Sequence, residues 1–177
     1  QLEVNKFLVS KHLVTNEQYL TFLTDTELYP EQKIIIESLI EKKRLHPVKY
    51  VRFNQAELYC KWLSEKTARL FRLMTEVEYE YLASNGGQTK YPFGDIITIA
   101  HVNTLEAGIG DTLEIGSQPS GDNQLGVSEL CGQVEEWTSS YYHPYPGGRL
   151  VKDRLYEYAG GSYPVLRGGA YNLNFDL

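Results

Sequence analysis

The chain has 177 residues, which fits one domain over residues 1–177 with a sizeable hydrophobic core. Fourteen tyrosines and fifteen glycines indicate a loop-rich domain whose irregular backbone is held by aromatic packing. The net charge of −6 comes without a stripe of lysines or arginines, which argues against a nucleic-acid partner, and the lack of a long apolar run argues against membrane insertion.

Helix and strand signals concentrate in the first half of the chain. Alternating apolar and polar residues over residues 3–10 predict a strand. Three helices are then predicted by a capping residue that is followed three positions later by Glu or Gln, so that side chains and free backbone N–H groups satisfy each other. The periodicity of residues 31–44 does not decide whether they form a short amphipathic helix or a mobile loop. The capped helices are expected over residues 16–24, 55–66 and 76–84, after Thr15, Asn54 and Thr75.

Apolar spacing indicates which side of each helix faces the core. Cys60 falls on such a face and is most simply a core thiol, far along the chain from Cys131. The two cysteines show no metal-ligand spacing, which favours a reducing, cytoplasmic compartment, although a single disulfide stays open. The residues expected to face the core are Tyr19, Phe22 and Leu23 in the first helix, Ala56, Tyr59, Cys60 and Leu63 in the second, and Val77 and Tyr81 in the third.

The second half of the chain is dominated by turn chemistry. The stretches NGG, YPFG, PSGDN and YPGG follow one another at close intervals after Asn85. Short strands are predicted over residues 134–140 (VEEWTSS) and 164–171 (PVLRGGAY). Helices first and short strands among loops afterwards predict an α+β domain.

Trp137 stands between a strand-like run and a polar loop, which predicts a large apolar anchor whose indole N–H needs one partner. Glu136 beside it is a candidate acceptor for backbone amides of a neighbouring loop. Adjacent residues on a strand point to opposite faces, so Glu135 and Glu136 are not expected to share a site as paired carboxylates.

Four more residues have expected structural roles. Arg72 and Glu78 are placed to form a partly buried, hydrogen-bonded pair that holds the third helix against the loops. Gly168 and Gly169 permit backbone conformations or close approaches that a Cβ forbids. We therefore expect these residues to support the fold rather than to contact a ligand.

Several motifs, taken in order from about residue 4 to residue 171, resemble the formylglycine-generating-enzyme family, also called the sulfatase-modifying-factor domain. The matching stretches are LVTNEQYLTFL, HPVKYVRFNQAELYCKWL, RLMTEVEYEYLASNGG, YPFG, VNT, QLGVSELCGQVEEWTSSYY and VLRGGAY. The resemblance implies a loop-rich variant of the C-type lectin fold, with two to three main helices and short antiparallel strands. Because the family normally closes with a further strand after the last motif, the resemblance also implies a domain that is incomplete at its C-terminus.

The resemblance does not extend to the cysteines that bind copper in this family. Formylglycine-generating enzymes use two cysteines just after the Arg-Gly-Gly-Ser motif, and soft thiolates are what Cu(I) requires. Here the first of those positions is Leu173, and the second falls past the end of the chain. Cys60 and Cys131 lie away from this motif, so we assign no catalytic residue.

A second enzymatic branch of the family comprises the iron-dependent sulfoxide synthases of thiol-histidine biosynthesis. These join such a domain to a helical domain that contributes the histidine ligands. The histidines of this chain, His12, His46, His101 and His143, are scattered without ligand spacing. An oxidoreductase whose catalytic parts lie outside this chain remains the alternative function, with copper-dependent formylglycine generation as its weaker form.

Calcium is a further cofactor that the resemblance implies. Family members often bind it through loops between the VNT motif and the tryptophan core, where this chain has the oxygen ligands Asn103 and Asp111. The chain departs from the family pattern at Gln133, where Asn is usual, and at Glu135, where Trp is usual. Turn-stabilising Asn and Asp side chains are the alternative.

The final stretch AYNLNFDL resembles the Asn-rich display segment of cysteine-free relatives such as the variable proteins of diversity-generating retroelements. An extended chain would place its polar and apolar side chains on opposite sides, and amides with nearby tyrosines make an adaptable recognition surface. We therefore expect a non-catalytic domain that binds a protein or a small-molecule ligand, with an edge strand lacking any ligand as the alternative. The candidate binding residues are Tyr141, Tyr142, Tyr171, Asn172, Asn174 and Asp176.

Overall fold

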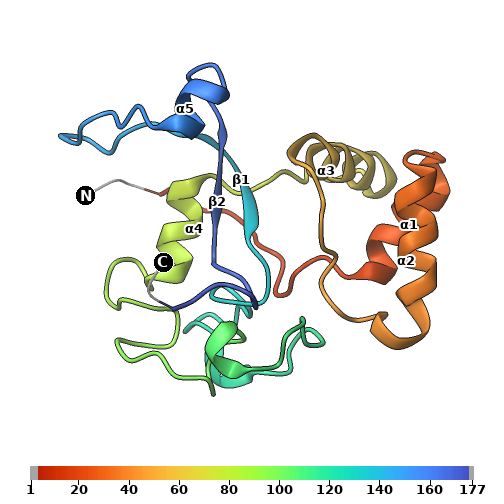
Figure 1. Cartoon of the computed structure of the whole chain (residues 1–177), viewed down its shortest axis with the longest axis horizontal. Coiled ribbons are helices and arrows are strands. Elements are labelled where there is room, and N and C mark those ends of the chain that lie inside the picture. Colours follow the sequence, from red (N-terminus) through yellow and green to blue (C-terminus); the bar gives the residue numbers. More distant parts are fainter. Residues whose placement is uncertain (1–3, 176–177) are drawn as a thin grey trace.

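The computed structural model describes residues 4–175, and within that range the helices come first and coil with two short strands follows. This confirms the predicted α+β organisation, with five α-helices in the described residues rather than two to three (Figure 1). In chain order the elements are α1 (Asn16–Thr26), α2 (Pro30–Lys43), α3 (Phe53–Thr67), α4 (Glu76–Ala83), the 3-10 helices η1 (Leu105–Ala107) and η2 (Pro119–Gly121), β1 (Glu136–Tyr141), α5 (Arg154–Tyr158) and β2 (Pro164–Arg167).

Helices α1, α2 and α3 gather around one aromatic cluster on one side of the molecule (Figure 1). The capping box predicted at Thr15 is present and starts α1. Pro30 lies in the first turn of α2, where its missing N–H needs no partner. The segment for which periodicity did not decide between a helix and a loop is therefore helical. None of the helices in the described range is both long and apolar enough to cross a bilayer. The buried residues of this cluster are Tyr19, Phe22, Leu23, Ile36 and Tyr59.

Two predicted features near the N-terminus are wrong. Residues 4–10 pair with no described strand and form no strand themselves. Their alternation reflects packing instead, because Leu8 is exposed while its neighbours Phe7 and Val9 pack on the second core. Helix α3 begins one residue before Asn54, because the Gln55 side chain accepts a hydrogen bond from the backbone of Arg52 at 2.8 Å. The helix start therefore moves to Phe53.

Helix α4 begins at the predicted capping box of Thr75 but buries a different face. Tyr79 and Leu82 are buried in a second core with Val127 and Leu130, whereas Tyr81 is 45% exposed. The predicted inward position of Tyr81 is therefore wrong. The Tyr79 ring lies inward, where its hydroxyl reaches the strand segment at the centre of the fold.

Strands β1 and β2 form an antiparallel pair that pairs Glu136 with Arg167 and continues toward Tyr141 through an irregular register. The Trp137 indole N–H finds the partner that the sequence requires, the carbonyl oxygen of Val51 at 2.8 Å. Strand β2 ends at Arg167, four residues short of the predicted strand 164–171. The glycines that follow explain this, because both have positive φ, and a Cβ at Gly168 would lie 2.6 Å from the Tyr79 hydroxyl.

Glu136 is held by a side chain rather than by the backbone amides that the sequence suggested. Its Oε1 lies 3.2 Å from the Tyr79 hydroxyl, which also contacts the carbonyl oxygen of Leu130 at 2.9 Å. Burial raises the pKa of Glu136 to about 7, and the nearby charge of Glu129 adds to this. Tyr79 has one hydrogen for two acceptors, so the protonated form of Glu136 completes the chain by donating to Tyr79, which donates to Leu130.

Arg72 and Glu78 form the predicted pair in a two-pronged geometry, with nitrogen–oxygen distances of 2.7 and 2.6 Å. Glu78 also accepts from the backbone of Thr75 at 2.8 Å, so one carboxylate both caps α4 and holds Arg72. The hydrogen bonds from Arg72 lower the pKa of Glu78 to about 2. This pair fixes the entry of the chain into α4.

Glu78→Gln tests the strength of this pair. We expect a loss of about 2 kcal/mol of unfolding free energy at pH 7 by urea denaturation, because Gln keeps the cap but loses the charge. Since the folded pKa lies below the unfolded value, the contribution is complete above pH 4.5 and disappears as the pH falls toward 2. Glu41→Gln, an exposed control on α2, should change stability by less than about 0.5 kcal/mol. Equal losses in both variants would contradict this role.

Glu136→Gln tests the raised pKa of this half-buried acid. The folded pKa lies above the unfolded value near 4.5, so the folded state binds more protons between pH 4.5 and 7, and wild-type stability should fall across that window. Above pH 7 we expect the variant to be more stable than wild type by about 2 kcal/mol, since Gln stays neutral and can still donate to Tyr79. Urea denaturation at pH 4.5 and pH 8 measures this. A variant less stable than wild type at pH 8 would overturn the assignment.

Candidate functional site

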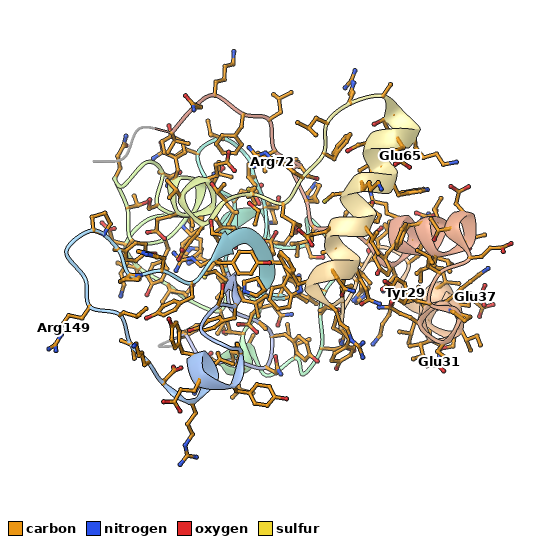
Figure 2. All side chains as sticks on the ribbon, turned by 90° about the horizontal axis from the view of Figure 1, so that it is seen from above. Tyr29, Glu31, Glu37, Glu65, Arg72 and Arg149 are labelled. Carbon is orange, nitrogen blue, oxygen red and sulfur yellow. The ribbon has the colours of Figure 1, made fainter. Side chains whose placement is uncertain are left out.

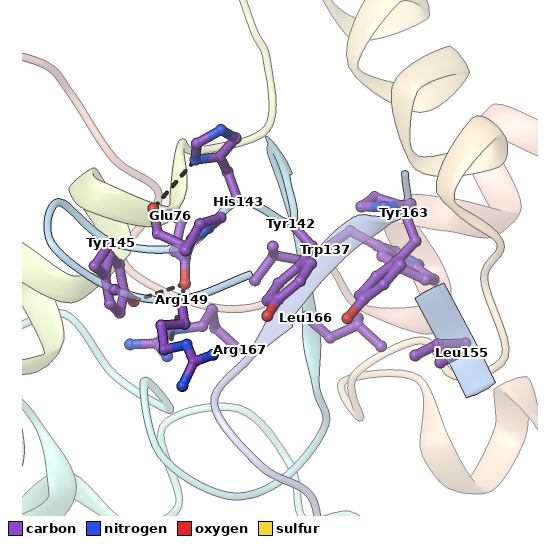
Figure 3. Close-up of a pocket in the computed structure, with 14 residues that line it drawn as sticks. Glu76, Trp137, Tyr142, His143, Tyr145, Arg149, Leu155, Tyr163, Leu166 and Arg167 are labelled. Atoms are coloured by element: carbon purple, nitrogen blue, oxygen red, sulfur yellow. Dashed lines mark hydrogen bonds and ion pairs between the residues drawn. The ribbon is translucent and has the colours of Figure 1, made fainter. Parts of the chain in front are cut away.

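A pocket of about 710 Å³ opens where the β1–β2 pair ends, between these strands and the segment 142–155 (Figure 3). The close-up shows Tyr142, Tyr163 and Leu155 along one part of it, and Tyr145, Arg149 and Arg167 at the other. Its volume lies within the usual range of small-molecule sites, which are mostly apolar with a few polar groups. The pocket is therefore the strongest candidate site in the described residues.

The apolar part of the pocket is a tyrosine wall. The rings of Tyr142 and Tyr163 stack in parallel, with centroids 5.1 Å apart and planes 3° apart, and Tyr156 meets Tyr142 edge-on. The backbone fixes this pair, because Tyr142 N donates to the carbonyl oxygen of Tyr163 at 2.8 Å. Trp137 and Leu166, which face each other in the ladder, also line the pocket. Because the two rings stack on each other, a planar ligand would stack on the outer face of this pair.

The polar part of the pocket is a network of charged side chains. The Tyr145 hydroxyl donates to Glu76 at 2.9 Å, and Arg167 lies 3.9 Å from the same oxygen of Glu76 while hydrogen-bonding Glu80. Arg149 also lines the pocket, and it makes no hydrogen bond or ion pair with any residue from 4 to 175. Figure 2 shows Arg149 projecting outward from its loop, at the opposite end of the molecule from Glu31 and Glu37.

The structure separates the tyrosines that the sequence grouped together. Tyr142 lines the pocket, whereas the exposed Tyr141 lies edge-on to Phe53 with centroids 5.9 Å apart. Tyr142 follows β1 at the end of the ladder where Tyr141 pairs with Pro164. Tyr171 lies beyond the other end, where Glu136 pairs with Arg167. Of the candidate binding residues that the structure describes, only Tyr142 belongs to the pocket.

The segment after Tyr171 turns instead of forming the expected extended strand. The backbone of Leu173 accepts from Leu105 N at 3.0 Å, and the carboxylate of Glu106 accepts from Phe175 N at 3.0 Å. Asn172 and Asn174 are nevertheless exposed, while Leu173 and Phe175 are half-buried. Asp176 lies outside the described residues.

The structure brings Asn103 and Asp111 together, as the calcium hypothesis requires, since the Asn103 amide donates to the Asp111 carbonyl oxygen at 2.8 Å. Asn103 Oδ1 is buried without a hydrogen-bond partner, which suits a cation ligand. The Asp111 carboxylate, however, is held by Lys43 and, at 2.6 Å, by Lys49. Burial alone would raise the pKa of Asp111, but the two lysines outweigh it and lower the pKa below its usual range. Two ammonium groups at this carboxylate disfavour a calcium ion beside it.

The described residues do not fit a copper–thiolate site. Leu173 occupies the expected cysteine position, and Cys60 and Cys131 are both free and half-buried. Burial raises the pKa of both thiols to about 11, so they stay protonated at neutral pH. Between residues 4 and 175, no three or more His, Cys, Asp or Glu side chains gather in a way that could hold a metal ion.

The pocket residues Arg149, Leu155 and Tyr163 were not predicted from the sequence. They lie in a stretch of turns and short elements that carries no helical or strand periodicity. The one available signal is the density of aromatic residues and prolines over residues 141–146, which marks a structured loop but not what the loop covers.

Comparison with known proteins places this fold in a family. The profile of the sulfatase-modifying factor enzyme 1-like domain matches residues 1–176. Hercynine oxygenase from Mycolicibacterium thermoresistibile is 33% identical over 141 residues, which cover 74% of this chain and 30% of that protein. The formylglycine-generating enzyme of Streptomyces coelicolor is 32% identical over 141 residues, which cover 71% of this chain and 42% of that enzyme.

Among solved structures, PvdO from Pseudomonas aeruginosa aligns with a TM-score of 0.65 at 23% identity, covering 93% of this chain and 68% of that one. That likeness shows a shared fold. The chain spans less than half the length of the two curated relatives. With the profile match over nearly every residue, the chain belongs to the sulfatase-modifying factor family, the family of the formylglycine-generating enzymes.

Proposed function

We propose that this chain is a binding domain that takes a small ligand in the pocket between the β1–β2 pair and the segment 142–155. The observation that carries the proposal is the tyrosine wall beside an arginine that has no partner among the described residues. Such a combination of apolar surface and a few convergent polar groups is typical of ligand sites.

The occupant of position 173 supports binding rather than thiolate chemistry. Leu173 has no group that can ligate a metal or attack a disulfide, and its backbone is engaged with Leu105. The exposed Asn172 and Asn174 beside it offer a second, shallower surface, which would serve a protein partner in the manner of a display segment. The pocket is the better candidate because it is concave and carries both apolar area and charge.

A second candidate function, that of an oxidoreductase, is favoured by the 33% sequence identity to hercynine oxygenase. This chain covers only 30% of that protein, so in a longer protein the reacting groups could come from regions outside these residues. We propose it as the alternative, with this domain then supplying a binding surface rather than the metal ligands.

The pocket proposal predicts saturable binding of the neutral apolar probe N-phenyl-1-naphthylamine, seen as a rise in its fluorescence. Tyr163→Ala should weaken binding about fivefold or more, because it removes half of the stacked wall. Tyr158→Ala is the matched control, since Tyr158 is 92% exposed and does not line the pocket. Equal weakening in both variants, or none in Tyr163→Ala, would count against the pocket.

Metal analysis tests whether this chain itself holds the metal of an oxidoreductase. The purified chain, analysed by inductively coupled plasma mass spectrometry after incubation with Cu(I) or Fe(II) and desalting, should retain far less than one metal ion per chain, because Leu173 replaces the thiolate ligand. The matched control is Leu173→Cys, which restores one soft ligand and should raise copper retention. Stoichiometric copper or iron in the wild-type chain would favour the oxidoreductase.

A further inference from the structure

Within the pocket, the polar groups left free by the described residues are hydrogen-bond donors. Among residues 4–175, the exposed Arg149 guanidinium at the rim of the pocket has no partner, and the Tyr163 hydroxyl makes no hydrogen bond. The Tyr142 hydroxyl already accepts from Val151 N at 3.4 Å, so its own hydrogen is available to a ligand. Building on the proposed binding function, we infer that the ligand is a small aromatic carboxylate, with its ring against the tyrosine wall and its carboxylate on Arg149.

The guanidinium of Arg149, which residues 4–175 leave unpaired, favours an anion over a cation as the ligand. Among the described residues, Glu76 is the one carboxylate in the lining, and it already accepts from Tyr145 and lies beside Arg167. Arg167 is shared between Glu76 and Glu80, so it has no charge left for a ligand. In the part of the chain that the structure describes, Arg149 is therefore the cation of the lining that is not engaged by a carboxylate. A ligand carboxylate would meet a planar guanidinium that binds two oxygens at once.

The number of free cations in the pocket lining favours a single negative charge on the ligand. A phosphate monoester carries nearly two charges at neutral pH and would need a second free cation. The nearest candidate, Arg167, is engaged by two glutamates. His143 also lines the pocket, but its Nδ1 lies 3.1 Å from the carbonyl oxygen of Pro144, so that nitrogen is directed to the backbone. One free arginine matches one carboxylate.

The apolar part of the pocket defines the rest of the ligand. The stacked pair of Tyr142 and Tyr163 offers an outer ring face, and Leu155 and Leu166 line the pocket with it (Figure 3). A planar ring system can stack on this face, whereas a flexible aliphatic chain would lose conformational entropy without gaining the ring contact. A pocket of about 710 Å³ has room for a fused two-ring system that also reaches Arg149.

Isothermal titration calorimetry with 2-naphthoate, 2-naphthamide and 2-naphthylmethylamine at pH 8 tests this inference, because the three probes share one ring system and differ in charge. We expect wild-type protein to bind the carboxylate about tenfold more tightly than the neutral amide, and the ammonium compound least. Arg149→Gln should weaken carboxylate binding about tenfold and leave amide binding within twofold. Arg149→Lys should keep part of the preference, since it keeps the charge but not the two-pronged geometry.

Arg154→Gln is the matched control, because it removes the same charge from the neighbouring helix α5 without touching the pocket lining. It should leave the binding of all three probes unchanged. If the amide binds as tightly as the carboxylate, or if Arg149→Gln and Arg154→Gln behave alike, the carboxylate assignment fails while the pocket stands. If none of the three probes binds and N-phenyl-1-naphthylamine does not bind either, the pocket proposal fails as well.

Discussion

The buried side chain and backbone of Gln133 connect the loop segments that make up the second half of this fold. Its Oε1 accepts from the Asn103 amide at 3.0 Å and from Leu113 N at 2.9 Å, while its backbone binds Asn103 O and Tyr171 N. Three segments with almost no regular structure are thus fixed to a single residue, which sits at a positive φ. The preceding Gly132 allows the close approach, because a Cβ there would lie 2.8 Å from the carbonyl oxygen of Asn103.

This arrangement gives the two ends of the β1–β2 pair different roles. At the Arg167 end, backbone bonds to Gln133 and Leu105 fix the segment from Tyr171 to Leu173 in place. At the other end, the chain leaves β1 into residues 142–155, where the tyrosine wall and Arg149 surround the pocket. A well-hydrogen-bonded support beside an open loop region is the usual way in which a rigid fold presents a binding site.

Sequence reasoning succeeds here where a local rule decides the outcome. The capping boxes of Thr15 and Thr75, the partner required by the Trp137 indole and the Arg72–Glu78 pair all follow from side-chain chemistry over short spacings. It fails where tertiary contacts decide. The stretch 4–10 alternates but pairs with no described strand, and the tail after Tyr171 alternates but turns. Tyr163 becomes a pocket residue because its carbonyl group binds the backbone N–H of Tyr142.

The central claim is that ligands bind beside the tyrosine wall and not at the segment that follows Tyr171. Backbone amide chemical shifts of isotopically labelled protein, recorded by NMR spectroscopy while 2-naphthoate is added, test it most directly. The account predicts saturable shifts at Trp137, Tyr142, Arg149, Tyr163 and Leu166, with residues 172–175 unchanged. Shifts that concentrate at residues 172–175 and leave the pocket unchanged would contradict it.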